Sequence, residues 1–252
     1  MATVGIPPSL LLLILDVHPT SWSILSSGSR TAKELEGSAT ISRAPVQSLG
    51  LAEFLNTLMI WLNAHLAARW GNEVVVFAAG AGTARQVYPS GLAGPSNLRS
   101  NVYQPFNMLD LELERALKSV EQEEQHLNDP PSIVSALTKA LCFINRVIPQ
   151  DSAESEVANT PDRLQPRIMI INATPSPTGE GEDGGSQRGG YVGMMNCVFA
   201  AQKGKVPIDV LTLPPEGGAP IFLQQAAHLT EGIYWRWNGR VGLLQYLHVS
   251  VG

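Results

Sequence analysis

Three side chains that could bind a ligand follow the first apolar segment of the chain. Asp16, His18 and Thr20 alternate in the window Asp16-Val17-His18-Pro19-Thr20. Alternate positions of an extended segment point the same way, so these side chains could converge on one ligand. A carboxylate and a hydroxyl supply the oxygen atoms that a hard cation such as Mg²⁺ prefers. A metal-ion site is therefore the first chemistry that the window suggests.

The window departs from a complete magnesium site. In von Willebrand factor A domains this site begins D-x-S-x-S after the first strand, and a threonine at a later helix start and an aspartate after a later strand complete it. Here His18 replaces the first serine, and imidazole is a softer ligand that suits Mg²⁺ poorly. Ser132 offers the helix-start hydroxyl, but Asn172-Ala173-Thr174 contains no acid. We expect no metal, and only a degenerate remnant of the site at Asp16, His18, Thr20 and Ser132.

Two other interpretations of this window stay open. In the first, the Asp16 carboxylate is structural: it accepts hydrogen bonds from nearby backbone N–H groups and shapes the turn. In the second, Mg²⁺ at Asp16, Thr20 and Ser132 captures an acidic side chain of a ligand. A titration with Mg²⁺ distinguishes the two.

Neither nucleotide binding nor nucleophilic catalysis has a supporting motif. The glycine-rich segment Ala78–Arg85 lacks the Walker lysine and the full G-x-G-x-x-G spacing. It lies between two expected strands, so no helix N-terminus faces a phosphate there, and a tight turn is the better interpretation. The sequence contains no G-x-S-x-G and no H-E-x-x-H, and its five histidines are scattered. We expect a protein that is not an enzyme.

The composition limits which binding partners and which cellular compartment we expect for this protein. The net charge of -5 argues against a broad DNA-binding face, so no direct contact with nucleic acid is expected. The apolar run Leu10–Leu15 ends at Asp16, too soon for a signal peptide or a membrane span. Cys142 and Cys197 stand apart without a zinc or disulfide pattern. An intracellular, reducing compartment is expected, with no membrane association.

Apolar periodicity predicts the elements that position these residues. A continuous apolar run at 9–17 is typical of a central parallel strand that is covered on both faces. Strands alternate with helices, which indicates one α/β domain over 1–252 with a mostly parallel sheet and helices on both faces. Polar insertions are expected near 23–47, 150–165 and 178–190. Further strands are expected at 73–80, 84–89, 167–175, 206–213 and 233–237, and helices at 48–71, 107–127, 132–148, 191–205, 219–232 and 240–252.

Several segments resemble the small von Willebrand A-type subunit of general transcription and repair factor IIH. They are LLLILDVHPTSW at Leu11–Trp22, LTKALCFINR at Leu137–Arg146 and, most strongly, YVGMMNCVFAAQKGKVPIDVLTL at Tyr191–Leu213. The resemblance implies a Rossmann-like von Willebrand A domain. It also implies a non-enzymatic scaffold of the nuclear factor IIH core, acting in transcription initiation and nucleotide excision repair.

The resemblance also implies partners. The family's small subunit pairs with the larger von Willebrand A-type subunit, through that subunit's zinc-binding domain, and meets other core subunits. Family members carry a C-terminal cysteine-rich zinc module. This sequence contains no such cysteines, so it is expected to be the A-domain fragment, without a cofactor of its own.

Aromatic residues are the candidate anchors for a partner, because such residues dominate interface energetics. They are Trp22, after the Asp16 loop, and Tyr234, Trp235 and Trp237 in one expected strand. The alternative is that Trp235 and Trp237 pack under the final helix. The expected helix 107–127 adds an acidic face that could steer a basic partner, formed by Glu112, Glu114, Glu121, Glu123 and Glu124.

Overall fold

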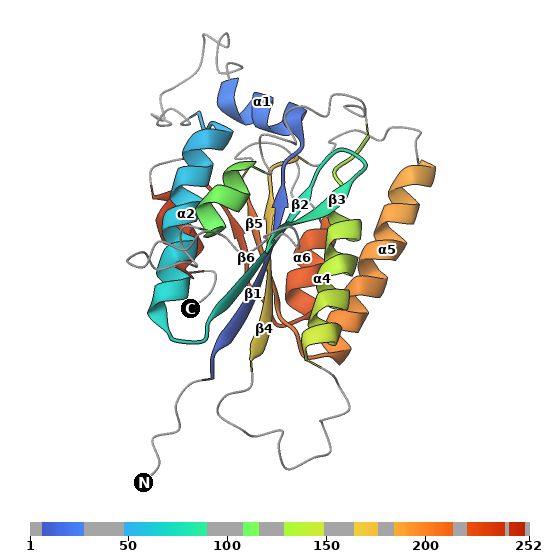
Figure 1. The fold of residues 1–252 in the computed structure, drawn as a ribbon. Coiled ribbons are helices and arrows are strands. Elements are labelled where there is room, and N and C mark those ends of the chain that lie inside the picture. The colour runs from blue at the N-terminus through green and yellow to red at the C-terminus, as the bar shows by residue number, and fades with distance from the viewer. Residues whose placement is uncertain are drawn as a thin grey trace, which may run out of the picture.

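A six-stranded sheet with the strand order β3-β2-β1-β4-β5-β6 forms the centre of the molecule (Figure 1). The computed structural model describes residues 7–27, 48–89, 108–115, 129–148, 164–175, 184–213, 221–239 and 242–249. Its strands are β1 (Ser9–Asp16), β2 (Glu73–Ala79), β3 (Ala84–Tyr88), β4 (Gln165–Asn172), β5 (Ile208–Thr212) and β6 (Tyr234–Arg236). Its helices are α1 (Pro19–Ser27), α2 (Leu51–Ala68), α4 (Ile133–Val147), α5 (Gly184–Lys203), α6 (Ile221–Leu229) and α7 (Leu243–Val249).

The sheet is parallel except at one edge. β1 pairs in parallel with β2 and β4, and β5 continues the parallel order to β6. β3 pairs antiparallel with β2, and both lie where the sequence predicts strands. In the turn between them the N–H of Gly80 donates to the carbonyl of Thr83 at 2.8 Å, so the segment Ala78–Arg85 contains a tight turn between two strand ends. The predicted α/β class with a mostly parallel sheet is confirmed.

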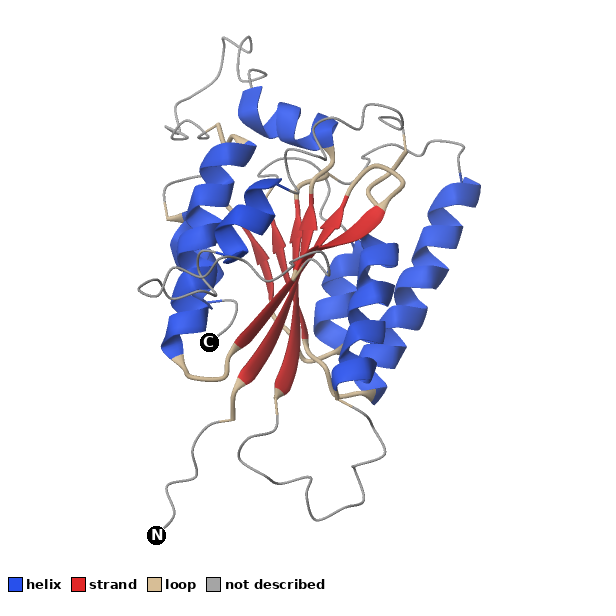
Figure 2. Ribbon diagram, in the orientation of Figure 1, coloured by secondary structure: helices blue, strands red, loops and turns tan. Residues whose placement is uncertain are grey.

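Helices cover both faces of the sheet (Figure 2). Alternate residues of β1 separate the two cores, because successive strand side chains point to opposite faces. Leu11, Leu13 and Leu15 pack with residues of α2 and α7. Leu10, Leu12 and Ile14 pack with residues of α4, α5 and α6. Burial on both faces explains why β1 has a continuous apolar sequence.

Two helices extend into segments where the sequence predicts polar insertions. α1 covers 19–27, with Pro19 at its first position, where a missing N–H costs nothing. Trp22 and Leu25 lie three residues apart on its buried side. α5 begins at Gly184, so 184–190 of the expected insertion is helical. The stretches 28–47, 149–163 and 176–183 lie outside the described residues.

The predicted helix at 107–127 is described only over 108–115, where it is helical. Glu112 is buried there, so it does not belong to an exposed acidic face as expected, and Glu121, Glu123 and Glu124 lie outside the described residues. Among the described helices, none combines the length and apolarity that crossing a membrane requires.

Candidate functional site

Asp16 ends β1 at the carboxyl edge of the sheet, and its carboxylate is fully buried. Oδ1 accepts a hydrogen bond from the N–H of His18 at 3.0 Å. Oδ2 accepts from the N–H of Ala173 at 3.1 Å, from the N–H of Thr174 at 2.8 Å and from Oγ1 of Thr174 at 2.6 Å. These contacts are those expected of a structural carboxylate, because three backbone N–H groups donate to it and hold the turn.

Burial and hydrogen bonding act in opposite directions on this carboxyl group. Burial raises the pKa of Asp16, while the hydrogen bonds from Thr174, His18 and Ala173 lower it in part. The Thr174 hydroxyl gives its one proton to Asp16, so the Ser21 hydroxyl, 2.8 Å away, donates to Thr174. A chain of donors therefore runs from α1 through the loop after β4 to Asp16.

His18 turns away from the carboxylate and ties the loop to the segment before α4. Its Nε2 lies 2.9 Å from the carbonyl oxygen of Asp129, and its Nδ1 lies 2.8 Å from Oγ1 of Thr20. A carbonyl only accepts, so Nε2 carries the proton and, in the neutral ring, Nδ1 accepts from Thr20. Ser132 begins α4 as the N-cap residue without a side-chain cap bond, and its N–H donates to the carbonyl of Gly80.

The residues around Asp16 do not fit a magnesium ion. Each carboxylate oxygen faces N–H or O–H protons, which a cation would have to displace. Where the second acid would stand, Asn172-Ala173-Thr174 contains none, and Ala173 and Thr174 turn donors toward Asp16. Within the described ranges, no group of three or more His, Cys, Asp or Glu side chains is placed to hold a metal. The sequence pattern did not single out Thr174 and Ser21 as site residues. Both carry hydroxyls, and Ser21 directly follows the window 16–20, while Thr174 lies in the segment after β4 that lacks an acid.

The structure places two of the four predicted aromatic anchors in the core, which corrects the prediction for them. Trp22 is buried, packs against Phe54 with ring centroids 5.1 Å apart and the rings tilted by 45°, and donates from Nε1 to the carbonyl oxygen of Asp16 at 2.8 Å. Trp237 is buried in the same core as the α7 residue Leu247. Both side chains are therefore part of the hydrophobic interior instead of the surface.

The other two aromatic anchors lie on β6 at the edge of the sheet. Trp235 is 37% exposed and meets Tyr246 of α7 edge-on, with ring centroids 6.3 Å apart. Tyr234 is half-buried on the opposite face, and its hydroxyl is buried without a hydrogen-bond partner. Of the predicted anchors, Trp235 presents the most accessible ring.

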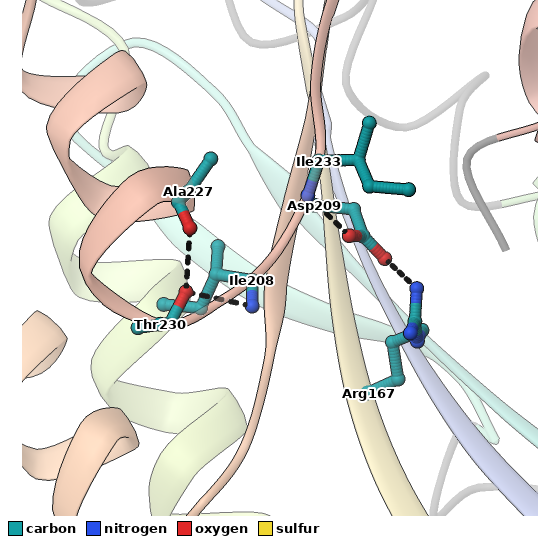
Figure 3. Close-up of polar contacts among 6 residues, drawn as sticks. All are labelled: Arg167, Ile208, Asp209, Ala227, Thr230 and Ile233. Carbon is teal, nitrogen blue, oxygen red and sulfur yellow. Dashed lines mark hydrogen bonds and ion pairs between the residues drawn. The ribbon is translucent and has the colours of Figure 1, made fainter.

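A second buried carboxylate holds β6 in position (Figure 3). Asp209 of β5 is fully buried; its Oδ2 accepts from Nη1 of Arg167 at 2.7 Å, and its Oδ1 accepts from the N–H of Ile233 at 2.8 Å. Burial raises the pKa of Asp209, and the Ile233 and Arg167 contacts lower it in part. Because Ile233 directly precedes β6, this ion pair positions the strand that carries Trp235.

The turn between α6 and β6 is fixed beside this ion pair. Oγ1 of Thr230 accepts from the N–H of Ile208 at 3.0 Å and lies 3.4 Å from the carbonyl oxygen of Ala227 (Figure 3). It also lies 2.8 Å from the carbonyl oxygen of Ala226. A Cβ on Gly232 would lie 2.0 Å from the carbonyl oxygen of Ile208. Sequence reasoning missed this cluster, and its signal was an aspartate inside the apolar strand VPIDVLTL.

This chain is similar to known proteins in both sequence and fold. The family model "Transcription factor Tfb4" matches residues 8–251. The general transcription and DNA repair factor IIH subunit tfb4 of Schizosaccharomyces pombe is 32% identical over 97% of this chain and 69% of its own. The crystal structure of the TFIIH p34 N-terminal domain is 27% identical, with a TM-score of 0.69 over 96% of both chains.

A more distant neighbour agrees in fold alone. The SpRpn10 VWA domain has a TM-score of 0.50 at 10% identity, and the match covers 96% of this chain. Together with the parallel sheet and its covering helices, this likeness makes the domain von Willebrand A-like. The family match spans nearly the whole described fold, including the Asp16 loop, β5 and β6. The chain belongs to the transcription factor Tfb4 family.

Proposed function

We propose that the protein is a non-catalytic subunit of general transcription and DNA repair factor IIH, and that it acts in the nucleus. Membership of the Tfb4 family supports this proposal, because curated relatives bear the name of that factor's subunit. In this proposal the domain is a scaffold that keeps the complex intact during transcription initiation and nucleotide excision repair.

One observation carries the non-catalytic role. At the edge of the sheet where A domains hold a cation, the Asp16 carboxylate accepts four hydrogen bonds from the chain itself, three on Oδ2 and one on Oδ1. A buried carboxylate that is held in this way suits neither metal binding nor the role of an accessible base, so the function is expected to lie in the protein surface. The same contacts oppose the alternative, a ligand-binding domain that depends on Mg²⁺ at Asp16, and we propose that this domain uses no metal cofactor.

The proposed partner is the larger von Willebrand A-type subunit of the complex, which binds through its zinc-binding domain. β6 supports this proposal as a contact surface, because it is an edge strand with Trp235 exposed beside it. An edge strand leaves backbone groups free to pair with another chain, and a tryptophan is a frequent interface anchor. Other core subunits are expected to contact the remaining surface.

Co-purification of the chain with the larger subunit tests this function. We expect the pair to elute together in size-exclusion chromatography, and Trp235→Ala to weaken the complex by about tenfold or more. Trp70→Ala is the matched control, because Trp70 is largely exposed and lies after α2, away from β6. A folded chain that does not bind the larger subunit contradicts the proposed partner. Equal weakening by both variants contradicts the assignment to β6.

A further inference from the structure

Two hydroxyl groups inside the molecule have no hydrogen-bond partner among the described residues. They are Oγ1 of Thr212, at the end of β5, and the phenol oxygen of Tyr234, on β6, and both oxygen atoms are buried. A buried hydroxyl without a partner costs folding free energy, because it has given up its hydrogen bonds to bulk water. Valine and phenylalanine have nearly the same shapes without that cost, so the two hydroxyls require an explanation.

The two hydroxyls belong to the same face of neighbouring strands. Successive strand side chains alternate between the faces of a sheet. Val210, two residues before Thr212, packs in the core formed with α4, α5 and α6, and Tyr234 packs against that core as well. Val210 pairs with Tyr234, and Thr212 pairs with Arg236. Thr212 and Tyr234 are therefore diagonal neighbours on the two strands that α6 contacts.

The level of the sheet at which Thr212 lies is polar. Asn172 of β4 pairs in register with Thr212, which pairs in turn with Arg236 of β6, so the three residues form one row across three strands. Asn172 is buried, and its amide donates to the carbonyl of Thr174 at 2.8 Å. An apolar cavity stays dry, whereas an internal water needs about two to four polar partners. The row and the two hydroxyls meet that requirement in kind.

We propose that internal water is bound between the sheet and α6, and that it completes the hydrogen bonding of Thr212 and Tyr234. A hydroxyl both donates and accepts, and a water molecule does the same, so water satisfies either orientation of each hydroxyl. A larger ligand does not suit the site, because both hydroxyl oxygens are buried. Water is small enough to enter through local openings of the chain.

This water supports β6 from one side of the sheet, and the ion pair of Asp209 with Arg167 supports it from the other. Asp209 alternates with Val210, so it faces the α7 side, where it accepts from the N–H of Ile233. Strand β6 has three residues, so few backbone hydrogen bonds fix it, and polar contacts on both faces hold the strand that carries Trp235. The support of β6 by water does not depend on which partner binds there, so it can fail while the proposed function stands.

Isosteric variants of the chain test the proposal by the sign of their effect. Thr212→Val and Tyr234→Phe each remove one hydroxyl and keep the shape of the side chain, and urea unfolding measures the unfolding equilibrium constant. If water is bound, each variant loses a hydrogen bond, and we expect the constant to rise by about three- to tenfold. If the site is dry, each variant removes an unpaired hydroxyl, and the constant falls or stays the same. That result in either variant would overturn the proposal.

Two matched variants calibrate this measurement. Thr230→Val removes a buried hydroxyl that accepts from the N–H of Ile208 at 3.0 Å, so it shows the effect of losing a buried hydrogen bond within the chain. Tyr191→Phe removes an exposed hydroxyl that lies 3.5 Å from Oε1 of Gln225, and it is expected to change the constant by less than about twofold.

Crystallography of the natural chain tests for the water directly and does not depend on the folding of any variant. We expect ordered water at about 2.8 Å from Oγ1 of Thr212 and from the hydroxyl of Tyr234. Electron density without water at these hydroxyls, or with a protein group bonded to them instead, would overturn the proposal.

Discussion

Thr174 donates from its Oγ1 to Oδ2 of Asp16 at 2.6 Å, and its backbone N–H donates to the same oxygen at 2.8 Å. The two residues are 158 positions apart in the chain and lie at the carboxyl ends of the adjacent strands β1 and β4. In a complete A-domain metal site an acid near this position faces the first aspartate across a cation. Here donors of the chain face Asp16 directly, so hydrogen bonds of the chain itself join the two strand ends.

Thr174→Val removes the shortest of these bonds and keeps the shape of the side chain. We expect the free energy of unfolding to fall by about 1–2 kcal/mol, because a buried carboxylate loses one charge-assisted hydrogen bond. Urea unfolding followed by circular dichroism measures the loss. Thr57→Val on α2 is the control, since its hydroxyl bonds only a backbone carbonyl at an exposed site, and it is expected to change stability by less than about 0.5 kcal/mol. Equal losses in the two variants would contradict this account.

Asp16→Asn is expected to be more harmful than Thr174→Val. The amide has one acceptor oxygen, and its NH₂ group would face N–H groups that now donate to the carboxylate. Opposed buried donors cost about 2–3 kcal/mol or more, and calorimetric melting should show the corresponding decrease in Tm. A variant as stable as the natural chain would show that the four hydrogen bonds around Asp16 contribute little to folding.

Added Mg²⁺ is expected to leave the stability of the chain unchanged. A ligand that binds only the folded state raises stability by an amount set by its concentration relative to its Kd, and donors of the chain already contact both carboxylate oxygens of Asp16. Thermal shift in millimolar MgCl₂, compared with an equal ionic strength of NaCl, measures the effect. A saturable rise in Tm that disappears in Asp16→Ala would instead support the Mg²⁺-dependent ligand-binding domain.

Arg167→Met is expected to make stability depend on pH. Burial raises the pKa of Asp209 above its ordinary value of 3.8, and the guanidinium of Arg167 opposes that shift. Without Arg167 the pKa of Asp209 in the folded state rises further. Asp209 therefore holds its proton more tightly in the folded variant than in the unfolded chain. Its stability relative to the natural chain should therefore fall as the pH rises above about 4, with a loss of roughly 2–3 kcal/mol at neutral pH.

Urea unfolding at several pH values measures that dependence, and hydrogen exchange of the Ile233 amide reports whether β6 loosens. The double variant Arg167→Met with Asp209→Leu is the control, because it carries no buried charge to titrate, and its stability relative to the natural chain should vary less with pH. A penalty for Arg167→Met that is the same at about pH 4 and about pH 7 would show that Asp209 is not the group responsible.

The strand β1 and the class of fold follow from local sequence. Leu10–Leu15 is apolar at every position, and a strand buried on both faces needs that composition whatever its neighbours are. The absence of an acid in Asn172-Ala173-Thr174 likewise argues against a metal on composition alone. The helix α1 was missed because Pro19 and four serines are typical of a loop, and burial of Trp22 and Leu25 outweighs that weak propensity.

The sequence by itself thus determined the parallel α/β fold, the loss of the second metal-site acid and the likeness to a family. Tertiary structure alone decided that Thr174 bonds Asp16, that Arg167 pairs with Asp209, and that Trp22 is in the core while Trp235 is exposed. The reason is physical. Periodicity reports which face of an element is buried, but a hydrogen-bond partner 42 or 158 residues away is chosen by strand order and register, which no local pattern records.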